Sequence, residues 1–397
     1  MLLDSDIFAS LLNIIPSYNS GVSNSKENSL DNLCKEFNIP ITNDIYYATA
    51  VSIGIESIQN FRSTILSLDT IDKNVLDVII KNKLNFIISF YYEHDNPTTS
   101  QWANNWFTEI FSKIGNLGIP LEQIILLTGD VNVSNKNTGK FNCLSINAFE
   151  YIYYKNMLHL IIDKNNDIHL DTEFKLDKKY DFLFLNSRPS PERCVLRYEL
   201  FASNLLKNSI NSWVIGNRKV DYLNIYNFVY QHMYKNKNYI ENVYNNSLKE
   251  VTLDSSRENL IKQAKQNIIP KEWRASTSFS LITETTVQKD NIFLTEKTYK
   301  AILHKHPFIL FSSNGSLKYL KSLGYETFNE LFDESYDNCS IYHKIQIIKE
   351  NLKRFKKIKC RNKINIITEK LNHNYNLFLK QPSLNETKNT VIKLIYG

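Results

Sequence analysis

Residues 291–316 read NIFLTEKTYKAILHKHPFILFSSNGS, and this stretch decides how the chain is expected to fold. Thr295 is a good N-cap and Glu296 suits the first position of a helix, so a short helix is predicted over residues 296–305. Residues 307–311 (PFILF) form a short apolar run typical of a buried strand. A helix that leads into a buried strand is typical of a parallel sheet covered by helices.

The same alternation of strand and helix patterns occurs along most of the chain. Further predicted strands are 45–53, 85–92, 123–128, 180–185, 212–215 and 278–283. Between about residues 135 and 178 Asn, Lys and Asp accumulate, which favours a domain boundary there. The sequence therefore predicts an α/β protein with two Rossmann-like domains, residues 1–175 and 176–345, followed by helices over residues 346–397. Packing of these last helices against the first domain is one option for them.

The composition excludes several classes of protein. The chain has 397 residues, 43% of them hydrophobic, which is enough for a large core and fits two domains. Its five cysteines are scattered without a CxxC pair, so neither a disulfide framework nor a zinc knuckle is expected. The N-terminus lacks a basic leader, and no apolar run is long enough to cross a bilayer. A cytoplasmic protein without membrane insertion is expected, and its oligomeric state is not predicted.

The charge of the chain is mildly basic. A net charge of +6 is compatible with anionic ligands or nucleic acid but identifies neither. Part of it comes from residues 353–359 (KRFKKIK), which are interpreted as a solvated helix face.

Two lysines follow the helix start in the stretch quoted first. Lys297 and Lys300 are expected in the first turn, where positive charge opposes the helix dipole by roughly 0.3–1 kcal/mol each. An anion at this position would offset that cost, because backbone N–H groups and ammonium groups would converge on it. The helix follows strand 278–283 and thus starts at the carboxyl edge of a sheet, where open α/β sheets bind ligands. The alternative is a pair of ordinary surface lysines.

Polar residues after other predicted strands extend this edge. Arg188 lies in the loop after strand 180–185 and suits bidentate phosphate contacts, with a hydrogen bond to a carbonyl as the alternative. Glu284 ends strand 278–283 and is interpreted either as a partner for a cation or as a ligand for a sugar hydroxyl. Asn314 belongs to the polar turn after strand 307–311 and is a further candidate for contacts to a nucleotide.

Three other residues in these elements are interpreted as structural. Arg197 is expected to be a surface residue engaged in an ion pair, and His304 and His306 flank the start of a strand.

Residues 279–328 (FSLITETTVQKDNIFLTEKTYKAILHKHPFILFSSNGSLKYLKSLGYETF) resemble the nucleotide-sugar-binding half of GT-B glycosyltransferases. The likeness is to the α1,3-fucosyltransferase type and to related glycosyltransferases of large DNA phages and viruses. In that family a strand ending in an acidic residue leads to a T-E-K helix start and then to a P-[FV]-[IV] strand. The resemblance covers roughly residues 180–340 and is specific only near 278–316. The N-terminal half matches by architecture alone.

The resemblance implies a GT-B-like fold, in which two Rossmann-like domains face a central cleft. It implies that Glu296 binds the ribose hydroxyls of a nucleotide and that Lys297 contacts its diphosphate. It implies that Arg188 offsets negative charge on the departing nucleotide. Lys300 is added as a phosphate ligand from the charge argument alone. The family's acidic-Asn-Ser signature reads Glu-Thr-Thr at residues 284–286, which leaves the sugar and the base open.

The remaining catalytic parts are expected in the N-terminal half. An inverting transfer needs a general base for the acceptor hydroxyl. Glu93 or Asp95, after strand 85–92, is the first choice, and Asp130 is the second. Capping of a turn or helix is the alternative for each carboxylate. Metal-dependent glycosyltransferases use a D-x-D motif after a strand, and the only one here is at residues 4–6, so no required metal is predicted.

The sequence therefore predicts a glycosyltransferase that moves a sugar from a nucleotide-diphosphate sugar to an acceptor hydroxyl. The acceptor is a glycan, a small molecule or a modified DNA base. The alternative is a non-catalytic nucleotide- or nucleic-acid-binding protein with the same basic groove. A Rossmann dehydrogenase and a P-loop enzyme are disfavoured, because G-x-G-x-x-G and G-x-x-x-x-G-K-[ST] are both missing from the sequence.

Overall fold

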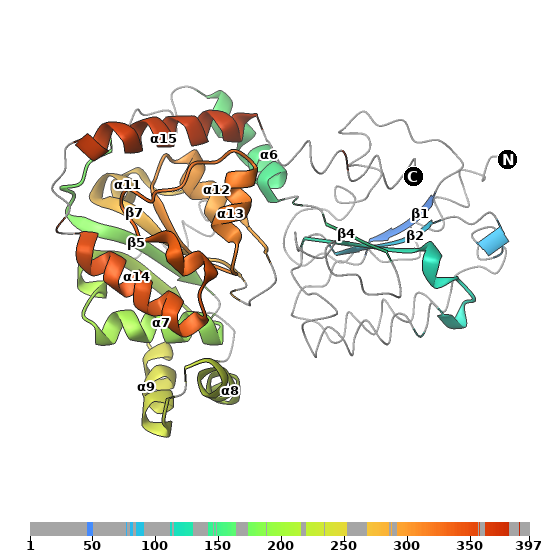
Figure 1. Ribbon diagram of the computed structural model, residues 1–397, viewed down its shortest axis with the longest axis horizontal. Coiled ribbons are helices and arrows are strands. Elements are labelled where there is room, and N and C mark those ends of the chain that lie inside the picture. The colour runs from blue at the N-terminus through green and yellow to red at the C-terminus, as the bar shows by residue number, and fades with distance from the viewer. Residues whose placement is uncertain are drawn as a thin grey trace. The chain divides into compact units, whose positions relative to one another are not determined.

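A computed structural model describes two compact units of the chain (Figure 1). The described residues are 46–50, 77, 80–81, 85–90, 112, 115–129, 142–145, 147, 149–163, 174–187, 189–215, 220–233, 235–251, 268–285, 287, 292–355, 357, 362–380 and 389. Unit 1 comprises Met1–Ala148 with Ser383–Gly397, and unit 2 comprises Phe149–Pro382.

Unit 1 contains a four-stranded parallel sheet. Its strands are β1 (Tyr46–Ala50), β2 (Asn85–Phe90), β3 (Ile124–Thr128) and β4 (Asn142–Ser145), and the short 3-10 helix η2 (Leu121–Gln123) leads into β3. The strand order is β1-β2-β3-β4, with Ala48 opposite Ile87 and Ile87 opposite Ile125. The strands are rich in β-branched and aromatic residues, which suit a pleated, buried surface. Among the described strands of this sheet the order follows the sequence without a reversal.

Unit 2 contains a second four-stranded parallel sheet, and its strand order does reverse. Its strands are β5 (Tyr180–Ser187), β6 (Ser209–Val214), β7 (Thr277–Thr283) and β8 (Phe308–Phe311), in the order β6-β5-β7-β8. Because β6 lies on one side of β5 and β7 on the other, the topological switch point lies between β5 and β7. The predicted α/β class with parallel strands is confirmed.

Helices connect and cover the strands of unit 2. They are α6 (Phe149–Ile162), α7 (Pro191–Ala202), η5 (Leu206–Asn208), α8 (Tyr222–His232), α9 (Lys237–Ser247), α11 (Lys271–Ser276), α12 (Glu296–Leu303), α13 (Ser316–Ser322), η7 (Glu334–Asn338), α14 (Ile341–Phe355) and α15 (Asn362–Leu379). No helix in the described part of the chain is long and apolar enough to span a membrane.

Helices lie on both faces of this sheet (Figure 1). The ring of Phe279 in β7 packs against Phe355 of α14, with ring centroids 4.7 Å apart. Ser280 is the next residue and points to the opposite face, where it lines a cavity together with Lys300 and Ala301 of α12. Every residue of β7 is buried, and each large apolar side chain buried here stabilises the fold by about 1.5–3 kcal/mol.

An aromatic cluster joins α6, α12 and α15. The rings of Tyr153 and Tyr299 lie 6.0 and 6.2 Å from that of Phe378, and all three side chains are buried. These contacts place α6 in unit 2, so the chain divides before this helix. The predicted domain boundary at residue 175 lies between α6 and β5, inside unit 2.

Candidate functional site

The predicted start of α12 is confirmed. Thr295 is the N-cap, and its side-chain oxygen accepts a hydrogen bond of 3.4 Å from the backbone N–H of Lys297. Leu294 precedes the cap and Tyr299 lies in the first turn, and both are buried as expected for a hydrophobic staple. The cap sets Glu296 and Lys297 as the first two residues of the helix and thereby fixes the positions of their side chains.

Glu284 is the anion that occupies this helix start. Its carboxylate is fully buried and accepts hydrogen bonds from the backbone N–H of Thr295 at 3.1 Å and from the Thr298 hydroxyl at 2.6 Å. The Thr295 hydroxyl donates a third bond, also of 2.6 Å. A carboxylate at a helix N-terminus is favoured by the helix dipole. Of the two interpretations left open for Glu284, its distance of 3.8 Å from the Lys297 ammonium favours the partner of a cation.

Lys297 turns its ammonium toward this carboxylate. Its Nζ donates to the hydroxyls of Thr295 at 2.8 Å and Thr285 at 3.3 Å. It also lies 3.8 Å from Glu284 Oε2 and 3.4 Å from Glu296 Oε1. The side chain remains 26% exposed, so solvent reaches it at the carboxyl edge of β7.

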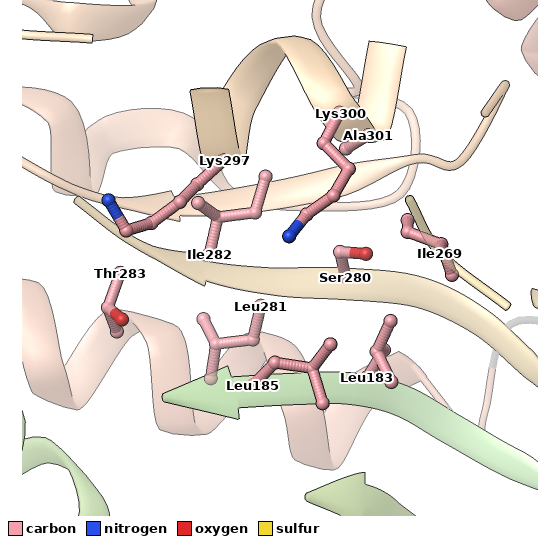
Figure 2. Close-up of a pocket in the computed structure, with 10 residues that line it drawn as sticks. All are labelled: Leu183, Leu185, Ile269, Ser280, Leu281, Ile282, Thr283, Lys297, Lys300 and Ala301. Atoms are coloured by element: carbon pink, nitrogen blue, oxygen red, sulfur yellow. The ribbon is translucent and has the colours of Figure 1, made fainter. Parts of the chain in front are cut away.

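Lys300 lies in a different part of α12 from the one predicted. The helix has only eight residues, so Lys300 belongs to its last turn, where the helix dipole favours a cation. The expectation that both lysines strain the first turn is therefore wrong for Lys300. Figure 2 shows its ammonium directed toward Ile282 and Ser280 on β7. Burial lowers the pKa of Lys300 and Lys297 lowers it further, while Glu296 and Glu284 oppose this shift.

A small cavity lies between α12 and the sheet (Figure 2). The residues that line it are Leu183, Leu185, Ile269, Ser280, Leu281, Ile282, Thr283, Lys297, Lys300 and Ala301. Its volume of about 40 Å³ leaves room for a few water molecules. Pockets that enclose small-molecule ligands measure about 300–1,000 Å³, so this cavity cannot contain a nucleotide.

Glu296 presents an ionised carboxylate at the same edge. Burial alone would raise the pKa of Glu296, but Lys297 and Lys300 outweigh it, and the net shift is downward. The side chain is 36% exposed. With Glu284 the site holds two carboxylates and two ammonium groups, so its formal charges cancel.

Arg193 of α7 is a residue of this site that the sequence analysis did not single out. Its guanidinium is buried and donates to the carbonyl oxygens of Ser187 at 2.9 Å, Thr283 at 3.3 Å and Glu284 at 3.0 Å. It thereby holds the carboxyl ends of β5 and β7 together at the topological switch point. Its position in the first turn of the helix after β5 is the one sequence signal that could have indicated this role.

Arg197 is buried, and the expectation of a surface ion pair is wrong. Its guanidinium donates to the side chain of Asn246 at 3.1 Å and to the Lys249 carbonyl at 2.8 Å. It also lies over the Trp213 ring, 4.9 Å from the centroid. Burial lowers the pKa of Arg197 to about 10. The residue is enclosed because α9 packs against α7, which sequence periodicity does not show.

His304 and His306 are both buried and hydrogen-bonded within the fold. His306 Nδ1 lies 2.7 Å from the Ser280 hydroxyl, and its Nε2 lies 3.0 Å from the Thr277 carbonyl oxygen. Burial lowers the pKa of His306 to about 3, so the ring is neutral and joins β7 to the start of β8. His304 Nε2 accepts from the backbone N–H of Ile269 at 3.0 Å. Both fit the structural interpretation.

Asn314 is half-buried in the turn between β8 and α13. The start of α13 is capped by Asp337, whose carboxylate accepts from the backbone N–H groups of Leu317 at 3.1 Å and Lys318 at 3.2 Å. An internal carboxylate thus takes the place that an anionic ligand would have at this helix. Contact between Asn314 and a nucleotide stays a prediction.

A buried lysine supports the same turn. Lys344 of α14 is fully buried, and its ammonium donates to the Ser312 carbonyl oxygen. Burial lowers the pKa of Lys344 to about 8, although Asp337 and Cys339 act in the opposite direction. The residue carries no sequence signal, because a lysine in an amphipathic helix is ordinarily exposed.

The stability of the wild type relative to Lys344→Met is expected to increase with pH. An unfolded lysine titrates near 10.4, so between about pH 8 and that value the unfolded state holds more protons than the folded state. The unfolding free energy of the wild type minus that of Lys344→Met should rise by about 3 kcal/mol between pH 7 and pH 10.5. Urea titrations across this range measure it. Lys353→Met, at an exposed position of the same helix, should show a constant difference, and a constant difference for Lys344→Met would contradict the prediction.

Four predicted site residues lie outside the described residues: Glu93, Asp95, Asp130 and Arg188. Within the described ranges no group of three or more His, Cys, Asp or Glu side chains is arranged to hold a metal ion.

No protein-family model, no curated protein and no solved structure matches the chain. The function is therefore inferred from the sheet topology of unit 2 and from the side chains at its carboxyl edge.

Proposed function

We propose that this protein is a glycosyltransferase that moves a sugar from a nucleotide-diphosphate sugar to an acceptor hydroxyl. The reaction is inverting and does not require a metal, and the acceptor is a glycan, a small molecule or a modified DNA base. One observation carries the proposal. Glu284, Glu296 and Lys297 gather at the carboxyl edge of a parallel sheet, beside the switch point between β5 and β7, where open α/β sheets bind ligands.

In this proposal Glu296 binds the ribose and Lys297 binds the diphosphate. The lysines keep Glu296 ionised, and a carboxylate can accept hydrogen bonds from two neighbouring ribose hydroxyls. Lys297 exchanges its contacts to Thr285 and Glu296, of 3.3 and 3.4 Å, for phosphate oxygens. Glu284 keeps the helix start in place while this exchange occurs. The diphosphate lies over the sheet edge, because the cavity beneath α12 is too small for it.

Catalysis requires more positive charge than the balanced cluster supplies. The leaving nucleotide gains negative charge, and fixed cations that face it are often the largest catalytic contribution. Arg188 is the proposed source. Arg188 directly follows Ser187 in the sequence. The guanidinium of Arg193 donates to the carbonyl oxygens of Ser187 and Glu284, so Ser187 and Glu284 lie close to each other. Glu93, Asp95 and Asp130 remain the proposed candidates for the general base.

Lys297→Ala is expected to weaken nucleoside diphosphate binding about tenfold or more, since a hydrogen bond to a charged group contributes about 1.5–3 kcal/mol. Glu296→Ala should weaken it through loss of the ribose contact. Calorimetric titration with UDP, GDP, ADP and CDP measures both effects. Lys237→Ala is the matched control, because Lys237 of α9 is 79% exposed and lies outside the site. Unchanged affinity in both site variants would rule out this site.

The second candidate is a non-catalytic nucleotide- or nucleic-acid-binding protein. The cancelling charges at the described site favour nucleotide binding without catalysis, because the site lacks the excess positive charge that would stabilise a departing diphosphate. Hydrolysis of a nucleotide sugar separates the two functions, since a glycosyltransferase slowly transfers its donor sugar to water. Binding without any turnover, and with an affinity for DNA that falls steeply with salt, would support the non-catalytic protein.

A further inference from the structure

The outer face of α8 exposes large side chains that the proposed donor site does not use. Leu223, Tyr226 and Tyr230 are 63%, 39% and 66% exposed. Their spacing of three and four residues places them along one side of the helix. Phe228 and Val229 are buried and attach the opposite side of α8 to the body of unit 2. We call the exposed side the tyrosine face, defined by Leu223, Tyr226, Asn227 and Tyr230.

The two tyrosines form an ordered surface. Their rings are nearly parallel, with an interplanar angle of 4° and centroids 6.2 Å apart. The helix that carries them is fixed at its start, because Asp221 accepts from the backbone N–H groups of Leu223 and Asn224. Tyr222 also packs edge-on against Tyr244 of α9, with centroids 5.2 Å apart. The helix that carries the rings is therefore supported by α9, which lies beside α8 in Figure 1.

The exposed residues of α8 carry no formal charge. Besides the leucine and the tyrosines they are Asn224, Asn227, Gln231 and His232, with the histidine taken as neutral. Charged residues make up 22% of the chain, and the polar face of a surface helix is normally rich in them. This surface thus combines aromatic rings with amide groups and omits the cations that phosphate groups require.

This combination matches a neutral sugar chain better than other partners. Nucleic acid needs lysine or arginine at its phosphates, and this face has neither. A stable protein partner covers about 20–30 residues a side, far more than one helix face. A pyranose ring exposes a face of C–H groups that packs on the negative face of an aromatic ring. Its hydroxyls pair with the donors and acceptors of asparagine and glutamine amides.

We propose that the tyrosine face binds a neutral oligosaccharide, with sugar rings packed on Tyr226 and Tyr230 and hydroxyls bonded to Asn227. α8 follows β6, the neighbour of β5, so its N-terminal end is connected to the carboxyl end of that strand. Binding itself does not depend on transferase activity. Only the assignment of this oligosaccharide as the acceptor, which selects a glycan among the possible acceptors, rests on the proposed function.

The test is a calorimetric titration of the full chain with malto-, cello-, manno- and chitohexaose. The wild type should bind at least one of them, and a protein with Tyr226→Ala and Tyr230→Ala should bind it about tenfold or more weakly. The matched control, Tyr226→Phe with Tyr230→Phe, keeps both rings and should retain affinity within about threefold. Binding of none of the four by the wild type, or equal binding by the alanine variant, would overturn the proposal.

Two further measurements distinguish oligosaccharide binding at the tyrosine face from self-association and from binding at the donor site. Light scattering reports whether the alanine variant changes oligomeric state, and conversion of a dimer to a monomer would overturn the proposal in favour of a second copy of this chain. Nucleoside diphosphate affinity of the alanine variant should equal that of the wild type, because the donor site lies at β5 and β7. A wild type that binds no oligosaccharide would therefore not contradict the proposed donor site. A wild type that binds no nucleoside diphosphate would not contradict oligosaccharide binding at the tyrosine face.

Discussion

Glu284→Leu should lower the unfolding free energy by about 3–5 kcal/mol, the cost of breaking a buried charged network from one side. The substitution leaves the Thr295 N–H and the hydroxyls of Thr295 and Thr298 without their common acceptor, and it removes the carboxylate that lies 3.8 Å from the Lys297 ammonium. Because these donors lie at the start of α12, the substitution weakens the attachment of the N-cap Thr295 to the carboxyl end of β7. Urea denaturation measures the total loss, and hydrogen exchange should show the largest increase in α12.

Glu284→Gln is the informative control for this change. The amide keeps the shape and one acceptor oxygen, so it can still bind the Thr295 N–H and the Thr298 hydroxyl. It removes the charge that faces Lys297 and should cost less than half of the leucine variant's loss. Equal losses for both variants would show that the charge of Glu284, and not its shape or its hydrogen bonds to the Thr295 N–H and the Thr298 hydroxyl, determines the effect.

Arg193→Met is the second change with a large expected effect, a loss of about 3 kcal/mol or more. It leaves the buried carbonyl oxygens of Thr283 and Glu284, and the partly exposed one of Ser187, without this donor. The carboxyl ends of β5 and β7 should then separate, and nucleoside diphosphate binding should be lost with them. Urea denaturation and calorimetry measure the two effects.

Arg354→Met serves as the matched control for Arg193, since Arg354 is exposed on α14. It should change the unfolding free energy by less than about 0.5 kcal/mol. Nucleotide binding that persists in Arg193→Met, with stability reduced, would show that the strand ends do not need this arginine to form the site.

Local patterns in the sequence were sufficient for seven of the eight described strands and for the cap of α12, but β4 (Asn142–Ser145) was not predicted. The apolar run at residues 180–185 lies within β5, and residues 278–283 lie within β7, because short buried strands have few alternatives. The N-cap at Thr295 was also predictable, since its contact to Lys297 is made within the same helix turn. Parallel pairing followed from the alternation of strands and helices.

Features that depend on distant contacts could not be predicted in this way. The strand order β6-β5-β7-β8 depends on pairing between segments nearly 100 residues apart, and no local pattern encodes it. α12 ends at Leu303, before the predicted end at residue 305, because Lys305 takes a left-handed conformation with φ of 49°. That early end moves Lys300 into the last turn. Arg193 and Lys344 resemble surface residues until the partners that bury them are known.

The cancelling charges of Glu284, Glu296, Lys297 and Lys300 bear on how a ligand would arrive. A neutral cluster exerts little long-range pull on a polyanion in solution, so these four groups give no electrostatic steering and no rate enhancement at low ionic strength. Selection at these groups then takes place only after encounter, when phosphate oxygens compete with Thr285 and Glu296 for the same ammonium protons.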